Sequence, residues 1–325
     1  MAIILLLMFT TVVGWSEPKK CRIALIVPEG DTSFFWQAVH AGAIKAQREL
    51  TNERNEVQLL WIAPHEPNSL KEEVNLVGDA VGSGVDGIAV APLDPHALVP
   101  PIELAIRQKI PVVAVELPLD YPLITSIVAT NNFQCGSEAS IIAGKLIGER
   151  GTVLIVRHLL TDLSSVKREN GFLDGIREFY GTVEAIVPQD YAGATDQEAY
   201  QFTLKLLKTY GGRINAMFTA DPMITKAAHR ALKDVGLTDR VKHVGFLYGN
   251  DALTAIKSGE LQGLVAPDPF TLGYLSTKCV YEAIKGHTVN PRIEVTEAAV
   301  IPGNLEDPQV KAILQPPIDQ YLRGD

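Results

Sequence analysis

The chain has 325 residues, with 38 acidic side chains against 29 basic ones, a formal net charge of −9 and three cysteines. At roughly 150 residues per domain this length favours two domains, and the hydrophobic fraction of 46% excludes a disordered chain, while the few cysteines exclude a disulfide-stapled miniprotein. The acidic balance, with a pI near 5.3, argues against a protein that binds nucleic acid by neutralising phosphates.

The first sixteen residues are predicted to be a signal peptide. Residues 2–13 form an apolar run of the length of a signal-peptide core, too short to cross a bilayer of about 30 Å as a helix. Gly14 and Ser16 offer a cleavage site, and Glu17 begins the polar mature chain. The alternative is a buried first strand or helix, since no Lys or Arg precedes the apolar run to orient it.

From residue 22 onward, short apolar runs alternate with amphipathic stretches. Residues 22–27 predict a strand that Pro28 ends, and apolar residues at helical spacing follow from Phe35 to Leu50. Further strands are expected at residues 57–62, 86–91, 111–115, 127–130, 152–156, 182–187, 215–218 and 241–246, with helices that include 69–83 and 95–108. Near-continuous apolar strands separated by helices indicate parallel sheets covered on both faces, so the expected fold class is α/β.

These strand and helix units are too many for one compact sheet. Residues 85–91 also resemble residues 213–219, so two similar doubly wound parallel-sheet lobes are predicted. Ligands of such sheets sit at the carboxyl ends of the strands. The candidate functional residues are therefore those that follow each strand.

Sequence signatures of catalysis are missing. No G-x-S-x-G, H-E-x-x-H, paired C-x-x-C or phosphate-loop motif occurs, and the turn at residues 28–33 lacks the glycine spacing of a dinucleotide site. The seven histidines are scattered singly, and Cys135 and Cys279 are expected to be buried in helices. We therefore predict a protein that is not an enzyme, with no catalytic residue, no cofactor and no metal site.

Aromatic and polar side chains gather at the expected strand ends. Thr32 or Ser33 is predicted to cap the helix after the first strand, which places the aromatic residues 34–36 at the sheet edge, where rings can cover the C–H faces of a sugar. The alternative is that Phe35 and Trp36 only pack this helix on the sheet. Polar residues that follow other strands, in turns that also favour capping residues, are Glu116, Asn131, Asn132 and Asp221.

Several segments resemble the type I periplasmic solute-binding proteins of ABC importers, most closely their ribose-binding-protein-like sugar-binding branch. The resemblance covers about residues 22–300 and is carried by residues 23–36, 85–92, 110–113, 168–172, 244–246 and 259–261, with a similar tail at 302–308. It implies two lobes joined by three hinge crossovers, near residues 130–131, 267–268 and 292–295. The implied N-terminal lobe is residues 22–130 plus 268–293, and the C-terminal lobe is residues 131–267 plus 294–325.

The same resemblance carries ligand-binding positions onto this chain. Four keep the family's residue type: Phe34, Phe35, Arg168 in its R-x-x-G-F context, and Tyr191. Three are altered but still polar, namely Thr32, Glu116 and Asp221, and the strand-end residue Asn131 completes the predicted set.

Three positions where ribose binders are polar are apolar here: Leu117, Leu247 and Pro267. Because a buried charge-assisted hydrogen bond contributes about 1.5–3 kcal/mol, their loss predicts a less polar pocket. We expect a deoxy sugar, a sugar derivative or another small polyol-like ligand rather than ribose.

The implied function is that of a monomeric periplasmic substrate-binding component of an ABC transporter. It would close on a sugar-like small molecule by hinge motion and deliver it to the membrane permease subunits. The alternative is a periplasmic ligand sensor that presents its bound form to a chemoreceptor or sensor kinase. The effector domain of a sugar-responsive repressor shares the fold but needs roughly sixty further N-terminal residues for a helix-turn-helix, and an enzyme on this fold would need a nucleophile and base that the sequence does not show.

Overall fold

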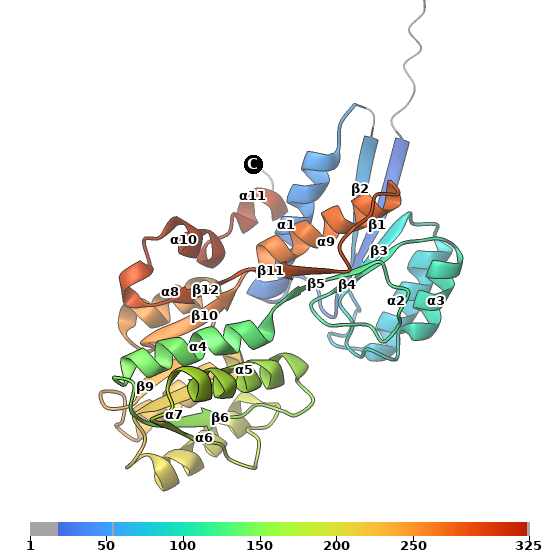
Figure 1. Ribbon diagram of the computed structural model, residues 1–325. Coiled ribbons are helices and arrows are strands. Elements are labelled where there is room, and N and C mark those ends of the chain that lie inside the picture. The colour runs from blue at the N-terminus through green and yellow to red at the C-terminus, as the bar shows by residue number, and fades with distance from the viewer. Residues whose placement is uncertain (1–18, 54, 324–325) are drawn as a thin grey trace, which may run out of the picture.

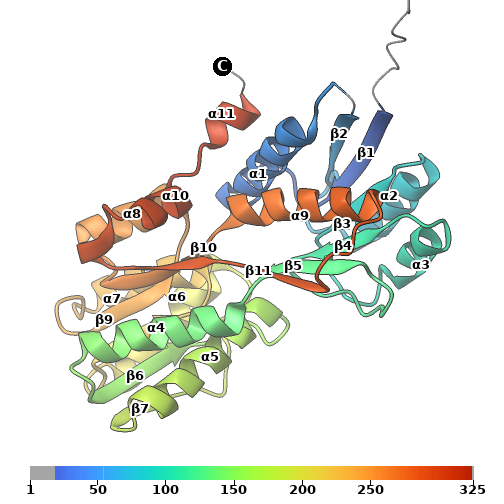
Figure 2. The same cartoon turned by 45° about the horizontal axis from the view of Figure 1, so that its top comes forward.

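The computed structural model describes residues 19–53 and 55–323, so the predicted signal peptide lies outside the described residues. The described strands form two six-stranded sheets, and Figures 1 and 2 show each sheet with its helices as a separate lobe. No helix in these ranges is long and apolar enough to span a membrane. The predicted α/β class with two doubly wound lobes is confirmed.

The first lobe is built on an all-parallel sheet. Its strands run in the order β11 (Arg292–Val295), β5 (Ser126–Thr130), β4 (Val112–Val115), β3 (Gly87–Val90), β1 (Lys19–Ile26) and β2 (Asn55–Ile62). Helices α1 (Phe34–Leu50) and α9 (Pro269–Ile284) cover one face, and α2 (Leu70–Gly82) and α3 (Val99–Arg107) cover the other. Every residue of β3 and β4 is buried, as a strand covered on both faces requires.

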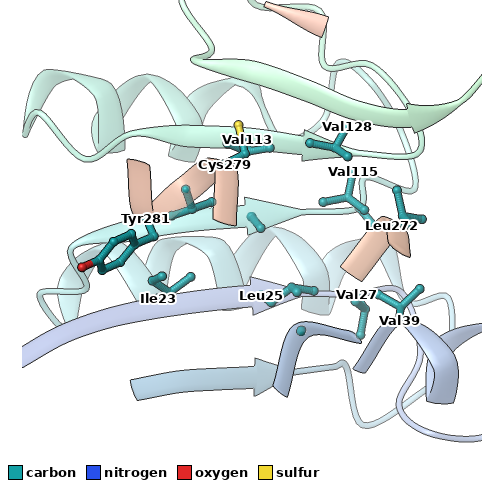
Figure 3. Packing of buried hydrophobic residues seen from close by; sticks show 14 of the residues in the cluster. Ile23, Leu25, Val27, Val39, Val113, Val115, Val128, Leu272, Cys279 and Tyr281 are labelled. Atoms are coloured by element: carbon teal, nitrogen blue, oxygen red, sulfur yellow. The ribbon is translucent and has the colours of Figure 1, made fainter. Parts of the chain in front are cut away.

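Side chains of β1 show how one strand serves two cores. Ile23 and Leu25, with Val27 directly after the strand, point toward α1 and α9, in the cluster that Figure 3 shows, whereas Ala24 and Ile26 belong to the cluster on the opposite face. Successive residues of a strand alternate between faces, so an uninterrupted apolar run fills both. Each large side chain buried this way contributes about 1.5–3 kcal/mol.

The second lobe repeats the first in strand order. Its sheet runs β12 (Glu297–Val300), β10 (Gly263–Pro267), β9 (Lys242–Phe246), β8 (Ala216–Thr219), β6 (Gly151–Val156) and β7 (Val183–Ile186), with only β12 antiparallel. Its helices are α4 (Asn132–Leu146) and α5 (Leu163–Phe179) on one face, α6 (Asp196–Tyr210) and α7 (Pro222–Asp234) on the other, and α8 (Gly249–Ser258) and α10 (Pro308–Leu314) around β10 and β12. The similar segments 85–91 and 213–219 contain β3 and β8, which hold equivalent places in the two sheets.

The chain crosses between the two sheets three times. It leaves the first sheet after Thr130, returns to it after Pro267, and leaves again at Thr296, between β11 and β12. The expected lobe boundary at residues 293 and 294 falls inside β11, which pairs with β5 as far as Val295.

One helix pair in the second lobe packs unusually closely. An ideal Cβ on Gly136 of α4 would lie 1.9 Å from the backbone oxygen of Arg168, and one on Gly171 of α5 would lie 1.9 Å from the backbone oxygen of Phe133. Only glycine permits this approach. The pair therefore fixes how deeply the first half of α5, including Arg168, sits against α4.

The C-terminal residues link the lobes a further time. After the short 3-10 helix η1 (Pro302–Asn304), α10 buries Val310, Ile313 and Leu314 in the second lobe. The segment 315–322, here called the C-terminal strap, then reaches α1 of the first lobe through α11 (Ile318–Leu322), which Figures 1 and 2 show beside α1. There the Arg48 guanidinium lies 5.1 Å from the centre of the Tyr321 ring.

Candidate functional site

A cavity of about 510 Å³ lies between the two lobes. Side chains from both sheets line it, and most follow the carboxyl end of a strand: Ser33, Phe34, Phe35, Trp36 and Glu116 from the first lobe, and Asp162, Ser164, Arg168, Asp221, Pro222, Met223, Lys226, Leu247, Tyr248 and Asp251 from the second. This position is the one expected for ligands of parallel sheets. The volume suits a small molecule.

The first lobe contributes an aromatic wall. Ser33 caps α1 by accepting a hydrogen bond from the Trp36 amide, so the first turn of the helix begins at the cavity. Phe35 meets Trp36 edge to face at 5.0 Å between ring centroids, and both rings also pack against the first-lobe core. Phe35 and Trp36 thus both pack against the core and line the cavity, so packing and a ligand contact are compatible for these rings.

Arg168 is the central cation of the cavity and is only 4% exposed. Its Nε donates to Asn132 Oδ1 at 2.7 Å, its Nη1 donates to the Ala220 carbonyl at 3.0 Å, and its guanidinium lies 4.4 Å from the centre of the Phe246 ring. These partners fix the guanidinium without neutralising it. Tyr248 is a further hydrogen-bond partner of the guanidinium, which leaves only some of its five N–H groups for a ligand.

Glu116 holds its carboxylate at the first crossover. The residue has a left-handed φ of 63°, a rare conformation for a side chain of this kind. Its Oε2 accepts from the amide and hydroxyl of Thr130 at 3.2 and 3.1 Å, and its Oε1 accepts from Asn132 Nδ2 at 3.4 Å. The Asn132 amide therefore connects the first-lobe carboxylate to the second-lobe Arg168.

An acidic group on the second lobe surrounds a histidine. Asp162 caps α5, Asp221 caps α7, and ligand atoms of both lie within 4.8 Å of each other and of His158. Burial raises the pKa of Asp162, but hydrogen bonds from His158 and Ser165 outweigh it and lower that pKa to about 2. Burial lowers the pKa of His158, yet Asp162 and nearby carboxylates raise it above its usual value.

These three side chains are the described residues with the donor set and spacing to hold a metal ion. However, His158 Nδ1 lies 2.9 Å from Asp162 Oδ2. Because the Asp162 carboxylate can only accept, this nitrogen donates a hydrogen bond to it rather than a lone pair to a metal. The group therefore fits an internal ion pair better than a metal centre.

Five of the eight predicted binding residues line the cavity: Phe34, Phe35, Glu116, Arg168 and Asp221. The other three lie outside its lining. Thr32 is exposed in the loop before α1. The Asn131 side chain caps α4 and donates to Glu294 at 3.1 Å, and the Tyr191 ring lies 4.3 Å from the Arg157 guanidinium. Asn131 and Tyr191 make contacts within the protein and Thr32 is exposed to solvent, so a ligand role for these three residues stays a prediction.

The prediction of a cavity less polar than that of ribose binders stays a prediction. Leu247 does line it and is 4% exposed, whereas Leu117 and Pro267 are not part of the lining. Sequence reasoning missed Asp162, Ser164 and Tyr248, which follow the carboxyl ends of β6 and β9 and could have been found by that criterion. Burial raises the pKa of Tyr248 to about 12, against the opposing effect of the neighbouring Arg168. The cavity is therefore both charged and aromatic.

Comparison with known proteins identifies the family. Residues 23–288 match the family described as the periplasmic binding protein domain. The chain belongs to this family. The resemblance seen in the sequence is thus confirmed, and the members of the family are solute-binding proteins rather than enzymes.

Relatives of this periplasmic binding protein include named sugar and polyol binders. The ribose import binding protein of Haemophilus influenzae is 25% identical over 283 residues, which is 87% of this chain and 92% of the relative. The xylitol-binding protein of Mycolicibacterium smegmatis is 25% identical over 209 residues, which is 64% of this chain and 58% of the relative. Together with the family, the ribose import relatives imply a periplasmic location.

Solved structures agree over nearly the whole chain. An ABC transporter solute-binding protein from Agrobacterium vitis with bound D-fucose has a TM-score of 0.77 at 25% identity, over 90% of this chain and 99% of that one. A carbohydrate transporter solute-binding protein from Agrobacterium radiobacter, in complex with D-arabinose, has a TM-score of 0.77 at 26% identity, over 91% and 99%. The two-lobed fold of this periplasmic binding protein is that of sugar-bound transport proteins.

Proposed function

We propose that this protein is the substrate-binding component of an ABC importer. It holds a sugar or sugar-like small molecule in the cavity between its lobes and delivers it to a membrane permease. The cavity carries the proposal, because it brings aromatic rings, carboxylates and a fixed guanidinium together from both lobes. Rings cover the apolar faces of a sugar, while carboxylates and guanidinium groups accept from and donate to its hydroxyls.

We assign roles to the five predicted binding residues that line the cavity. The rings of Phe34 and Phe35 stack against the sugar, Glu116 and Asp221 accept from its hydroxyls, and Arg168 donates to them. Burial of Arg168 and the apolar wall exclude water, which strengthens each of these hydrogen bonds. We assign Asn131 and Tyr191 to the fold around the cavity, and we assign no ligand contact to the exposed Thr32.

The lobes open and close around the ligand by hinge motion at the three crossovers. We assign residues 22–130 and 268–295 to one lobe, and residues 131–267 and 296–323 to the other. A ligand that contacts both lobes stabilises the closed form by its difference in affinity for the closed and open forms. The closed form is then the one that the permease recognises.

The export route is part of the same proposal. Residues 1–16 direct the chain to the periplasm and are removed there. Sequencing the N-terminus of protein from a periplasmic fraction should give Glu17 as the first residue. Protein that starts at Met1 in that fraction would contradict cleavage.

Mass spectrometry of small molecules released from the purified protein tests the ligand class. A thermal-shift panel of D-ribose, D-fucose, D-arabinose, D-allose and xylitol complements it. We expect a released carbohydrate or polyol, and stabilisation by at least one compound of its class. Release of an amino acid, a peptide or a lipid, with no response to any sugar, would overturn the proposal.

A further inference from the structure

The charges that line the cavity do not balance. Its lining carries the carboxylates of Glu116, Asp162, Asp221 and Asp251, against the cations of Arg168 and Lys226. Even when His158 beside Asp162 is counted as protonated, four carboxylates face three cations. One negative charge remains uncompensated.

Within the described ranges of the chain, Glu116 and Asp221 are the two lining carboxylates without an ion pair. Arg168 is under the influence of Glu116, so the surplus charge falls on Asp221, which has only a share in His158. Lys226 pairs with Asp251 at the exposed rim, and His158 pairs with Asp162. Asp221 uses Oδ1 to accept from the Met223 and Ile224 amides at 2.8 and 3.2 Å, and among the described residues no ion pair reaches it. Its second oxygen is thus an anionic acceptor at the cavity surface.

Closure of the lobes makes such a charge costly unless it acquires a partner. A carboxylate withdrawn from water without a counter-charge is disfavoured, and a neutral hydroxyl compensates only part of that cost. Aromatic rings add a second preference, because Phe34, Phe35, Trp36 and Tyr248 all line the cavity. The face of an aromatic ring attracts a cation as well as the C–H groups of a sugar.

We propose that the ligand is an amino sugar that carries one protonated amine, which binds to Asp221 on the Asp162 side of the cavity. Its hydroxyls take the places at Arg168 and Glu116 already assigned to a sugar. The inference rests on the proposed function, which it narrows from sugars in general to sugars with one positive charge. A charge of +1 matches the single uncompensated carboxylate.

Matched sugars test the proposal by calorimetric titration in EDTA. The probes are the 2-amino, 3-amino and 6-amino derivatives of D-glucose, each beside D-glucose and beside its N-acetylated form, which keeps the nitrogen but loses the charge. At least one amine should bind at least tenfold more tightly than both neutral partners. The molecule released from the purified protein should contain a basic nitrogen.

The variant Asp221→Asn removes the charge and keeps a side chain that can still cap α7. It should weaken binding of the amine at least tenfold more than it weakens binding of the neutral sugar, because only the amine loses an ion pair. Asp239→Asn is the matched control, because it removes the same charge from an exposed position of the second lobe. It should leave both affinities unchanged.

The outcomes separate this inference from the general function. Equal binding of amines and neutral sugars, or release of a carbohydrate without a basic nitrogen, overturns the amino-sugar inference and leaves the sugar-binding function standing. Release of a ligand that is no carbohydrate or polyol overturns both. Stabilisation by zinc or calcium ions alone, reversed by EDTA and lost in Asp221→Asn, assigns the free carboxylate to a metal and also overturns the inference.

Discussion

The rings of Phe35 and Tyr248 meet edge to face across the cavity, with their centroids 5.5 Å apart. Phe35 lies in the first turn of α1 in the first lobe, and Tyr248 caps α8 in the second. A second contact lies beside it, where the Phe34 ring occupies the space that a Cβ on Gly249 would need. Both contacts join the lobes, so separation of the lobes must break them.

Replacement of Phe35 by Leu should therefore favour the open form of the ligand-free protein. An aromatic pair contributes about 0.5–1.5 kcal/mol beyond its buried area, which corresponds to a twofold to tenfold change in the equilibrium. Single-molecule energy transfer between labels at Asn75→Cys on α2 and Gln201→Cys on α6 measures the equilibrium between open and closed forms. Both positions are exposed, whereas the native cysteines are at most 3% exposed, so the labels attach to the new cysteines. Phe179→Leu, at a ring that is 48% exposed, is the control. An unchanged distribution in Phe35→Leu would show that the ring pair does not hold the lobes together.

Arg168→Ala should weaken binding of the best sugar from the panel at least tenfold. The side chain supplies charge-assisted hydrogen bonds, each of which contributes about 1.5–3 kcal/mol. Titration calorimetry checks the affinity, and Arg177→Ala provides the control on the same helix, because Arg177 is exposed. Unchanged affinity in Arg168→Ala would return Arg168 to a structural role.

Gly136→Ala should lower both stability and ligand affinity. The new methyl group would collide with the Arg168 backbone oxygen, and forced overpacking costs about 1–3 kcal/mol or more. Gly144→Ala is the matched control at the other end of α4, where the added group would meet the Tyr180 ring. Urea unfolding should show both variants destabilised, while titration should show weakened binding only for Gly136→Ala. Equal affinities in the two folded variants would mean that the close helix contact does not position Arg168.

Removal of the strap, by a stop codon after Gln315, should broaden the distribution of lobe separations and speed sugar release at least threefold. The strap is anchored on both lobes, and its two prolines make a stiff connection of about 3.1 Å per residue that cannot stretch as the lobes part. Energy transfer and stopped-flow dissociation measure the two effects. Lys311→Ala, which breaks only the exposed pair with Glu306, should change neither. If the shortened chain releases sugar at the original rate, the strap does not restrain opening.

Glu73 predicts a pH dependence of stability. This α2 residue is fully buried, and burial raises its pKa from 4.5 to about 7 against the effect of the Leu93 amide that donates to it. The folded state thus binds more protons than the unfolded state between these values. The contribution of Glu73 to the free energy of unfolding is therefore fully present below about pH 4.5 and is lost as the pH rises through 7.

Glu73→Gln should remove this fall, which amounts to roughly 2–3 kcal/mol for such a shift. Urea unfolding at pH 5 and pH 8 compares the variant with the original chain. Asp79→Asn, at an exposed position of the same helix, should leave the difference between the two pH values intact. Glu297, whose pKa burial raises to about 7, adds a fall of the same sign that Glu73→Gln leaves in place.

The two lobes could be predicted because a parallel strand that is buried on both faces is a continuous apolar segment in the sequence. Residues 86–91 form one continuous apolar segment after Asp86, and β3 occupies residues 87–90 with every position buried. Helix ends were less predictable. The helix expected at 95–108 begins only at Val99, because Asp94 Oδ1 accepts from the His96 and Ala97 amides and holds the preceding residues in a turn.

From the residues alone, the cavity was predictable only where a strand end points into it. Asp221 follows this rule, whereas Arg168 lies inside α5 and was predicted from the family resemblance. Tyr191 lies beyond β7, an edge strand of the second sheet, where its ring packs on Arg157. Asn131 shows the other limit, since the same amide group can cap a helix or contact a ligand and the sequence does not distinguish the two. Tyr248 follows β9 and so meets the strand-end criterion, but its packing against Phe35 of the opposite lobe joins residues distant in the chain and could not be predicted.

The last strands of the chain have a consequence for its synthesis. β11 and β12 form an edge of each sheet, and both lie within residues 292–300. A chain that stops before residue 292 would leave β5 and β10 with bare backbone hydrogen-bonding groups, which are templates for aggregation. Neither lobe can finish folding until about nine-tenths of the sequence has been made, so prematurely terminated products of this gene should be targets for proteolysis rather than functional single lobes.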